Sequence, residues 1–368
     1  GDGPGVLPWP FHQADIPEGG ALLGEQRLED LLGPLLPKNL TRFAVKDIFD
    51  HSVLQQLPAS LTDFDVIVSA THPDILSFYH PDSTKIRIRP ISVKLKVFPF
   101  PNKLQFLELH YINDDICAML PPGLQVLEIV GGGLITTKGA SKLPTSLTSF
   151  TAYFEMFDDN QSMSHLRHIP NIELKCQQEF VKCNVDQNWI SSLLPLPSSP
   201  SSSIDDSGCT NLNDINPHLT SLSVSVVGGL GPAKIRPFIQ KPFFDALPKF
   251  PNLNKLSISG FGGISSDWLS LIPQNVTDLK IGYLVTYPTA TQLSMLPKCL
   301  RYLTINVNST QCDWNDETLQ SLPRTLQTLR IIGPFPNLTN RMHEYLPPCL
   351  QVSNLLFVTP LDRLYGEE

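Results

Sequence analysis

A ten-residue phrase recurs along the chain and constrains its fold more than any other feature. "LPRTLQTLRI" at 322–331 returns as "LPKCLRYLTI" at 296–305, "IPQNVTDLKI" at 272–281 and "LPPGLQVLEI" at 120–129. Counted from the first Leu of the L-x-x-L core, the last copies are 23, 24, 26 and 24 residues apart. A period of 20–26 residues is typical of a solenoid, in which each unit buries its apolar face only by stacking against its neighbours.

The pattern changes within each unit. The L-x-I piece alternates apolar and polar residues, which predicts a short strand with one buried face. A loop follows, and then a stretch such as 113–121, 265–273 or 315–323 that opens with Asn, Asp or Ser and stops at proline. Such a stretch predicts a capped helical turn or short helix. The alternation predicts an α/β solenoid with parallel strands on one side and helices on the other.

On these residues the chain resembles the leucine-rich-repeat superfamily over about 35–360. The resemblance implies a curved parallel sheet on the concave side, and it is closer to the helix-backed type (F-box-like or ribonuclease-inhibitor-like) than to the short bacterial effector type. The Asn that the family places three residues after the last strand position is mostly missing. Gly132, Phe261, Leu284 and Pro334 stand there, and Asn308 is the exception. We therefore expect the convex helices to hold these loops.

The ends and one interruption suggest the domain organisation. Residues 1–34 are interpreted as an N-terminal cap, 35–345 as a solenoid of about 12 repeats, and 346–368 as a C-terminal capping repeat and tail. A low-complexity insertion near 176–216 interrupts the solenoid, and the repeat resumes after it. Gly1 in first place indicates a fragment or a processed chain.

Composition excludes several classes of function. Fourteen of the 34 prolines fall in copies of the repeated phrase, so they mark the repeat. The net charge of −8 argues against a general nucleic-acid binder, which needs a basic face. No run approaches 18 apolar residues, so no membrane span is expected.

The cellular compartment has two interpretations. Seven cysteines without a C-x-x-C pair favour a reducing compartment, cytoplasmic or nuclear. Five glycosylation sequons, at Asn39, Asn160, Asn275, Asn308 and Asn337, favour a secreted or cell-surface protein. Cys299 and Cys349 share one repeat position two repeats apart, which is too far for a disulfide between them.

We find no chemistry-bearing motif. The glycines in 226–234 fit neither nucleotide-loop pattern and are interpreted as a turn. His165, His168, Cys176 and Cys183 could be imagined as a zinc set, but their spacing matches no known finger. No nucleophile and base can be placed on adjoining repeats. We therefore predict no enzyme activity, cofactor or metal.

The strand register predicts the inward face. With the first Leu of L-x-x-L counted as zero, positions two, four and six point away from the core. The N-terminal rows combine charges with aromatic anchors, as protein interfaces do, whereas the C-terminal rows are mostly small and polar. The predicted contact residues are Arg42, Lys85, Arg87, Arg89, Phe106, Glu108, His110, Glu128 and Tyr153.

Together with the resemblance, this face predicts a non-catalytic module, monomeric on its own, that binds a protein partner. One use would be substrate recognition in an F-box-like ubiquitin ligase. The alternative is a glycosylated recognition ectodomain at the cell surface.

Overall fold

The computed structural model describes residues 39–48, 58, 60–68, 82–88, 100–177, 189–194, 217–227, 241–259, 266–284, 286–307, 313–333 and 335–357. Across them, thirteen strands form a single parallel sheet in which each strand pairs with the next one along the chain. The strands are β1 Arg42–Ile48, β2 Asp63–Val68, β3 Lys85–Ile88, β4 Phe106–Asn113, β5 Val126–Leu134, β6 Ser149–Tyr153, β7 Asn171–Gln177, β8 Ser221–Val227, β9 Lys255–Ser259, β10 Asp278–Leu284, β11 Tyr302–Val307, β12 Thr328–Gly333 and β13 Val352–Phe357.

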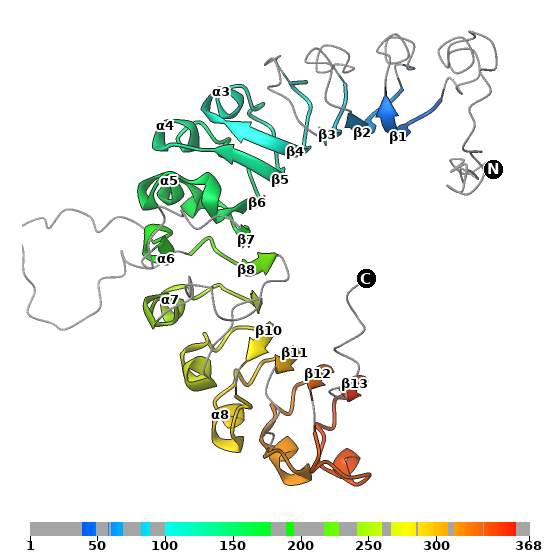
Figure 1. Cartoon of the computed structure of the whole chain (residues 1–368), viewed down its shortest axis with the longest axis vertical. Coiled ribbons are helices and arrows are strands. Elements are labelled where there is room, and N and C mark those ends of the chain that lie inside the picture. The colour runs from blue at the N-terminus through cyan, green and yellow to red at the C-terminus, as the bar shows by residue number, and fades with distance from the viewer. Residues whose placement is uncertain are drawn as a thin grey trace, which may run out of the picture.

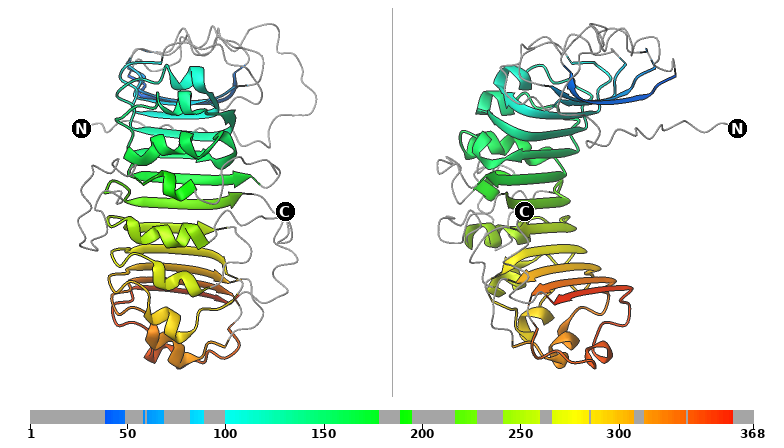
Figure 2. Two further views of the ribbon diagram at one scale, coloured as in Figure 1. Left: turned by 90° about the vertical axis from the view of Figure 1, so that its left-hand side faces the viewer. Right: turned by 45° about the vertical axis from the view of Figure 1, so that its right-hand side comes forward.

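From β4 to β12, short helices follow the strands and lie on the other side of the sheet. They are α3 Asp114–Cys117, α4 Thr137–Ala140, η3 Phe154–Met156, α5 Asn160–Ser164, η4 His165–His168, α6 Trp189–Ser192, α7 Lys241–Ala246, η7 Leu247–Lys249, η8 Ser266–Leu271, α8 Ala290–Ser294, η9 Asp316–Ser321 and η10 Met342–Glu344, where η denotes a 3-10 helix. Figure 1 shows the strands lining the inside of an arc and the helices its outside. Figure 2 shows the same strands stacked like rungs along its length.

This arrangement is a leucine-rich-repeat solenoid. The fold class expected from the repeat is therefore confirmed: the sheet is parallel, curved and backed by short helices. The predicted helical turns at 113–121 and 315–323 correspond to α3 and η9, and that at 265–273 contains η8.

The recurring proline has a structural reason. At eight repeats its carbonyl accepts the N–H of the apolar residue three positions later, for example Pro101 from Leu104, at 3.0–3.2 Å. Proline ends the preceding helical turn because it lacks an N–H, and its carbonyl closes the turn into the next strand. One residue thus marks the same corner in successive repeats.

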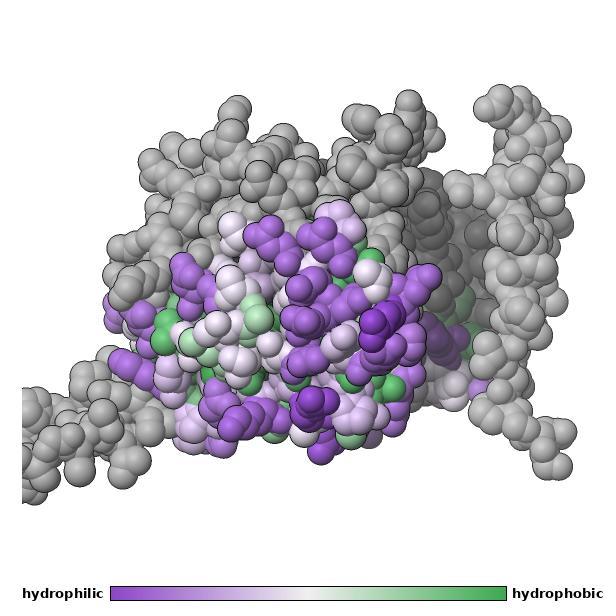
Figure 3. Space-filling view, turned by 90° about the horizontal axis from the view of Figure 1, so that it is seen from below, coloured by the Kyte–Doolittle hydropathy of each residue, from purple (hydrophilic) through white to green (hydrophobic). Residues whose placement is uncertain are grey.

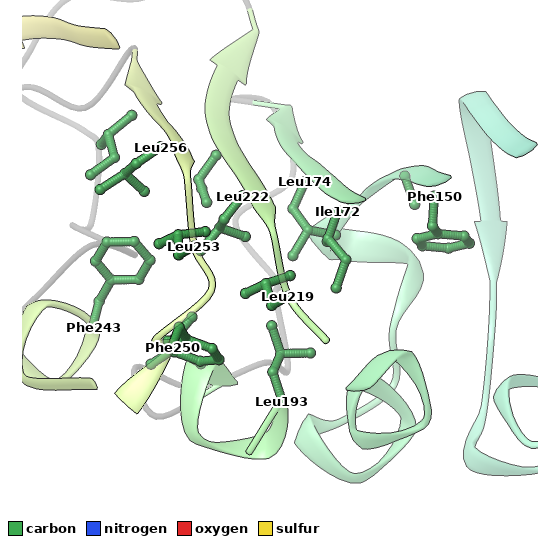
Figure 4. Close-up of a cluster of buried hydrophobic side chains, with 14 of the residues drawn as sticks. Phe150, Ile172, Leu174, Leu193, Leu219, Leu222, Phe243, Phe250, Leu253 and Leu256 are labelled. Carbon is green, nitrogen blue, oxygen red and sulfur yellow. The ribbon is translucent and has the colours of Figure 1, made fainter. Parts of the chain in front are cut away.

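In the strands whose side chains the structure describes, positions three and five form the core. Leu107, Leu127, Leu279 and Leu329 at position three are all 0% exposed. Each such burial contributes about 1.5–3 kcal/mol. Figure 4 shows this packing near the middle of the arc, where side chains of β6 to β9 meet Leu193, directly after α6, and Phe243 of α7.

Several predictions fall outside the described residues, which include none of 1–38, 178–188, 195–216, 228–240 or 358–368. The proposed N-terminal cap, most of the insertion and the C-terminal tail lie there, so the domain boundaries stay predictions. The strands on either side of the insertion, β7 and β8, pair directly. No helix in the described part of the chain is long and apolar enough to cross a membrane.

Candidate functional site

Two rows of strand positions cross the concave face, one residue per strand. The strand register aligns them from β1 to β13. The second-position row runs Arg42, Asp63, Lys85, Phe106, Val126, Ser149, Asn171, Ser221, Lys255, Asp278, Tyr302, Thr328 and Val352. The fourth-position row runs Ala44, Asp65, Arg87, Glu108, Glu128, Thr151, Glu173, Ser223, Ser257, Lys280, Thr304, Arg330 and Asn354.

The N-terminal end of the second-position row alternates in charge. Asp63 Oδ2 lies 3.5 Å from Arg42 Nε and 4.0 Å from Lys85 Nζ. The Arg42 side chain remains 65% exposed. Exposed pairs of this kind contribute little to stability, so Arg42 keeps most of its capacity to contact another molecule.

An aromatic ring links the two rows at β3 and β4. The Lys85 ammonium lies 4.9 Å from the centre of the Phe106 ring, and the Arg87 guanidinium 5.0 Å from it. Arg87 Nε also lies 3.2 Å from Glu108 Oε2. Because both side chains of this ion pair are largely buried, 18% and 5% exposed, solvent screens it less than the pair at Arg42. The cluster Lys85, Arg87, Phe106 and Glu108 is held together by its own charges.

Carboxylates gather in the middle of the fourth-position row. Burial raises the pKa of Glu128, and the neighbouring carboxylate of Glu108 raises it further, against the lowering effect of Lys175 and Arg87. Glu173 accepts a hydrogen bond from Thr151 Oγ1 at 3.5 Å, and its other oxygen lies 3.7 Å from Lys175 Nζ. The centre of the concave face is therefore acidic.

Two residues at the sixth position are fixed by their neighbours. A Cβ at Gly131 would lie 2.7 Å from the His110 ring, so the ring packs closely on the backbone of β5. The Tyr153 hydroxyl donates to the Val130 carbonyl at 3.3 Å. Tyr153 is only 8% exposed and Glu108 only 4%. Both lie on strands of the expected face but are more covered than the sequence suggested, because neighbouring strands crowd them.

Eight of the nine predicted contact residues thus lie on β1 and β3 to β6. Arg42, Lys85, Arg87, Phe106, Glu108 and Glu128 are held at row positions that the structure brings together. Arg89 lies outside the described residues. The role of all nine residues in binding a partner stays a prediction.

The convex side carries a contact that the sequence analysis missed. The Asp114 carboxylate accepts the backbone N–H of Thr136 at 2.9 Å and its hydroxyl at 2.6 Å. Asp316 accepts the N–H of Thr339 at 2.8 Å and also its hydroxyl. In each case a carboxylate of one repeat caps the loop of the next repeat. The repeated "ND" at 113–114 and 315–316 was the available signal.

The cysteines in the described part are all thiols. Cys117 is buried, and burial with the charge of Asp114 raises its pKa to about 12. Cys176 donates to Glu155 Oε1 at 3.0 Å, and Cys299 to the Gln274 carbonyl at 2.9 Å. Cys349 is exposed. Cys299 and Cys349 directly precede the segments of β11 and β13, two strands apart.

Within the described ranges, no three His, Cys, Asp or Glu side chains come together as a metal site would require. Of the four residues considered for zinc, Cys183 lies outside those ranges.

Comparison with known proteins identifies no family for this chain. No protein-family model matches the sequence, and no curated protein matches it. One similar solved structure is described as "The crystal structure of CroV588 a novel circular LRR protein structure". It is 14% identical, with a TM-score of 0.25, over 86% of this chain and 53% of that chain. This chain thus spans about half the length of that protein. The assignment of the fold rests on the repeat and the sheet register instead.

Proposed function

We propose that the chain is a binding solenoid that holds a protein partner on its concave face. The observation that supports this most is the cluster at β3 and β4, where Phe106 carries two cations over its ring beside an ion pair. Aromatic and arginine side chains with surrounding charge are typical centres of protein interfaces. The exposed Arg42 extends the same surface towards β1.

The test uses the full-length chain as bait in its own cells, with captured proteins identified by mass spectrometry. The variant Arg42→Glu with Lys85→Glu reverses two charges on the face. The matched control, Lys138→Glu with Lys142→Glu, makes the same change in net charge at two exposed convex lysines. We expect the first variant to recover at least about tenfold less partner than the unchanged chain, because like charges across an interface repel strongly. Equal recovery from both variants would contradict the proposed face.

At a finer level, we propose that the partner is a substrate recruited for a larger assembly, as in the F-box type of repeat protein. The separate thiols agree with a reducing compartment. The side-chain amide of Asn275, one of the sequon residues, donates to the Pro251 carbonyl, and a glycan would replace one of the two N–H bonds of that amide. The secreted alternative has the five sequons in its favour.

One measurement separates these two uses. The intact mass of the chain from its own cells reports glycans and disulfides, and the captured proteins report the assembly. A bare chain with a ubiquitin-ligase adaptor supports recruitment, whereas a glycosylated chain with an extracellular partner supports the ectodomain.

Light scattering is expected to give a free monomer near 40.9 kDa.

A further inference from the structure

The C-terminal part of the concave face carries a second group of residues, on β10, β11 and β12. Lys280, Thr304 and Arg330 are direct neighbours in the fourth-position row. Tyr302 lies in the second-position row of the middle strand, between Asp278 and Thr328. The core residues that alternate with them, such as Leu303 and Ile305, are at most 1% exposed, so the group faces away from the core.

This group is open, unlike the cluster at β3 and β4. Tyr302 is 47% exposed, and both Lys280 and Arg330 are exposed. Among the described residues, no carboxylate lies within ion-pair distance of the charged group of Lys280 or Arg330, whereas Arg87 lies 3.2 Å from Glu108. The nearest acidic residue in the register is Asp278, which stands opposite Lys255 on β9. The two cations therefore remain available to a bound molecule.

The chemistry of the group favours an anion. Arg and Lys side chains form short, strong hydrogen bonds to carboxylates and phosphates, and the hydroxyls of Thr304 and Tyr302 supply neutral donors between them. An exposed tyrosine ring adds contact area at low cost in side-chain entropy. The end of the arc seen in Figure 3, formed by the C-terminal repeats, is mainly hydrophilic, with hydrophobic residues scattered singly. The concave positions beside this group, Asp278, Thr304 and Thr328, are polar as well, so polar recognition suits it better than a broad apolar contact.

We propose that Lys280, Tyr302 and Arg330 form a subsite for a short acidic segment of the protein partner, with a carboxylate or phosphate seated over Thr304. This inference deepens the proposed function and rests on it for the identity of the partner. Along the same face Glu108, Glu128 and Glu173 repel anions, so a long polyanion lying over the whole arc is disfavoured. The acidic segment is thus confined to the C-terminal part of the face, around β10 to β12.

The test measures direct binding of synthetic peptides to the full chain by fluorescence anisotropy. The probes are eight-residue fluorescein-labelled peptides that carry two glutamates, two phosphoserines or, as the neutral match, two glutamines. We expect both anionic peptides to bind, the neutral one to bind at least about tenfold more weakly, and rising salt to weaken binding. Because phosphoserine carries more charge than glutamate, tighter binding of the glutamate peptide would identify a carboxylate as the natural group.

The variants locate the site. Lys280→Glu with Arg330→Glu is expected to lower the affinity for the anionic peptides at least about tenfold, while Lys138→Glu with Lys142→Glu, with the same net charge, leaves it within about twofold. Lys280→Gln with Arg330→Gln gives an intermediate loss and guards against a folding defect, which circular dichroism checks. Equal loss in the two charge-reversed variants, or equal binding of the glutamine peptide, would overturn the subsite.

Two further outcomes are distinguishable. Tighter binding of a single-stranded oligonucleotide than of either anionic peptide, lost in the same variant, would replace the protein partner with a nucleic acid. Because the peptide assay needs no natural partner, it can support the subsite even if capture through Arg42 and Lys85 fails. Failure of the assay with successful capture would reject the subsite alone.

Discussion

At the scale of single residues, the pairing of Arg87 with Glu108 is the contact that most directly couples the proposed binding face to stability. Removing the guanidinium leaves a carboxylate that is only 5% exposed without its partner at 3.2 Å. We expect Arg87→Met to lower the free energy of unfolding by about 2 kcal/mol, less than the loss for a fully buried pair. Urea unfolding of the full chain measures this.

A double-mutant cycle provides the control for this pair. Arg87→Met with Glu108→Gln removes both charges and is expected to recover part of the stability that the single change loses. A loss below about 0.5 kcal/mol in Arg87→Met, within the range of ordinary surface changes, would show that the pair is only a solvated contact.

For Glu128 we predict the opposite effect, a gain in stability when its charge is removed. Its pKa in the folded chain is raised above the usual value, so the protein binds a proton there more readily when folded than when unfolded. The stability that comes from protonated Glu128 is therefore fully present below the usual pKa of a glutamate. It is lost as the pH rises through the raised pKa that this residue has in the folded chain. At pH 7 the carboxylate is unfavourable, and Glu128→Gln is expected to stabilise the chain by a few tenths of a kcal/mol, since solvent screens a half-exposed group.

The measurement is urea unfolding of Glu128→Gln and the unchanged chain, at pH 7 and near pH 4. The advantage of the glutamine is expected to shrink at the lower pH, where both side chains are neutral. A variant that is less stable at pH 7 would show that the contact of Glu128 with Lys175 and Arg87 outweighs burial and repulsion.

At the scale of elements, a carboxylate contact joins α3 to Thr136 at the start of α4 in the next repeat. Asp114→Ala removes the acceptor of two Thr136 hydrogen bonds and should cost about 1–2 kcal/mol, as the loss of a helix cap does. Asp115→Ala is the matched control, because Asp115 is exposed one residue further along the same turn.

Hydrogen exchange of the α4 amides together with urea unfolding tests this contact. Faster exchange in α4 is expected for Asp114→Ala and not for Asp115→Ala. Equal effects of the two substitutions would mean that the loops depend on the helix dipole rather than on the hydrogen bonds to Thr136.

Aromatic rings hold neighbouring helices on the convex side. Phe154 lies 4.9 Å from Trp189, Trp189 lies 5.7 Å from Phe243, and Phe244 stacks on Trp268 at 4.5 Å. Each such ring pair contributes about 0.5–1.5 kcal/mol beyond the burial of its area. The chain of rings runs from η3 through α6 and α7 to η8, and so bridges the repeats on both sides of the insertion.

The strands could be predicted from the sequence far better than the convex side or the site. Leu127 and Leu279 occupy the same position of their repeats, in strands where apolar and polar residues alternate. Their burial therefore follows from the local pattern. Glu108 has the same local pattern as any outward residue, and its burial depends on neighbours such as Arg87 on β3, a strand that only stacking brings close. The open cations Lys280 and Arg330 were missed for the same reason, because sequence shows charges but not which of them are paired.

At the scale of the whole molecule, each strand pairs only with its neighbours in the chain, so a local defect should stay local. Leu127→Ala on β5 leaves a cavity at a fully buried position and is expected to cost about 2–5 kcal/mol. Hydrogen exchange should accelerate in β4 to β6 and remain unchanged in β11 and β12.

Leu303→Ala on β11, where the leucine is 1% exposed, is the matched variant and should give the reverse pattern. Uniform acceleration along the arc in either variant would indicate that the solenoid unfolds as one cooperative unit.

The regular register also makes the concave face a ruler for whatever lies along it. Successive strands are about 4.8 Å apart, so Lys280 and Arg330, two strands apart, are separated by about 9.6 Å at the backbone. A polyproline-type peptide advances about 9.3 Å in three residues and returns to the same side. An α-helix advances about 5.4 Å per turn and drifts half a strand out of phase within roughly four turns. The face therefore selects by period as well as by charge: an extended ligand can stay in step with it over many repeats, and a helical one only over a few.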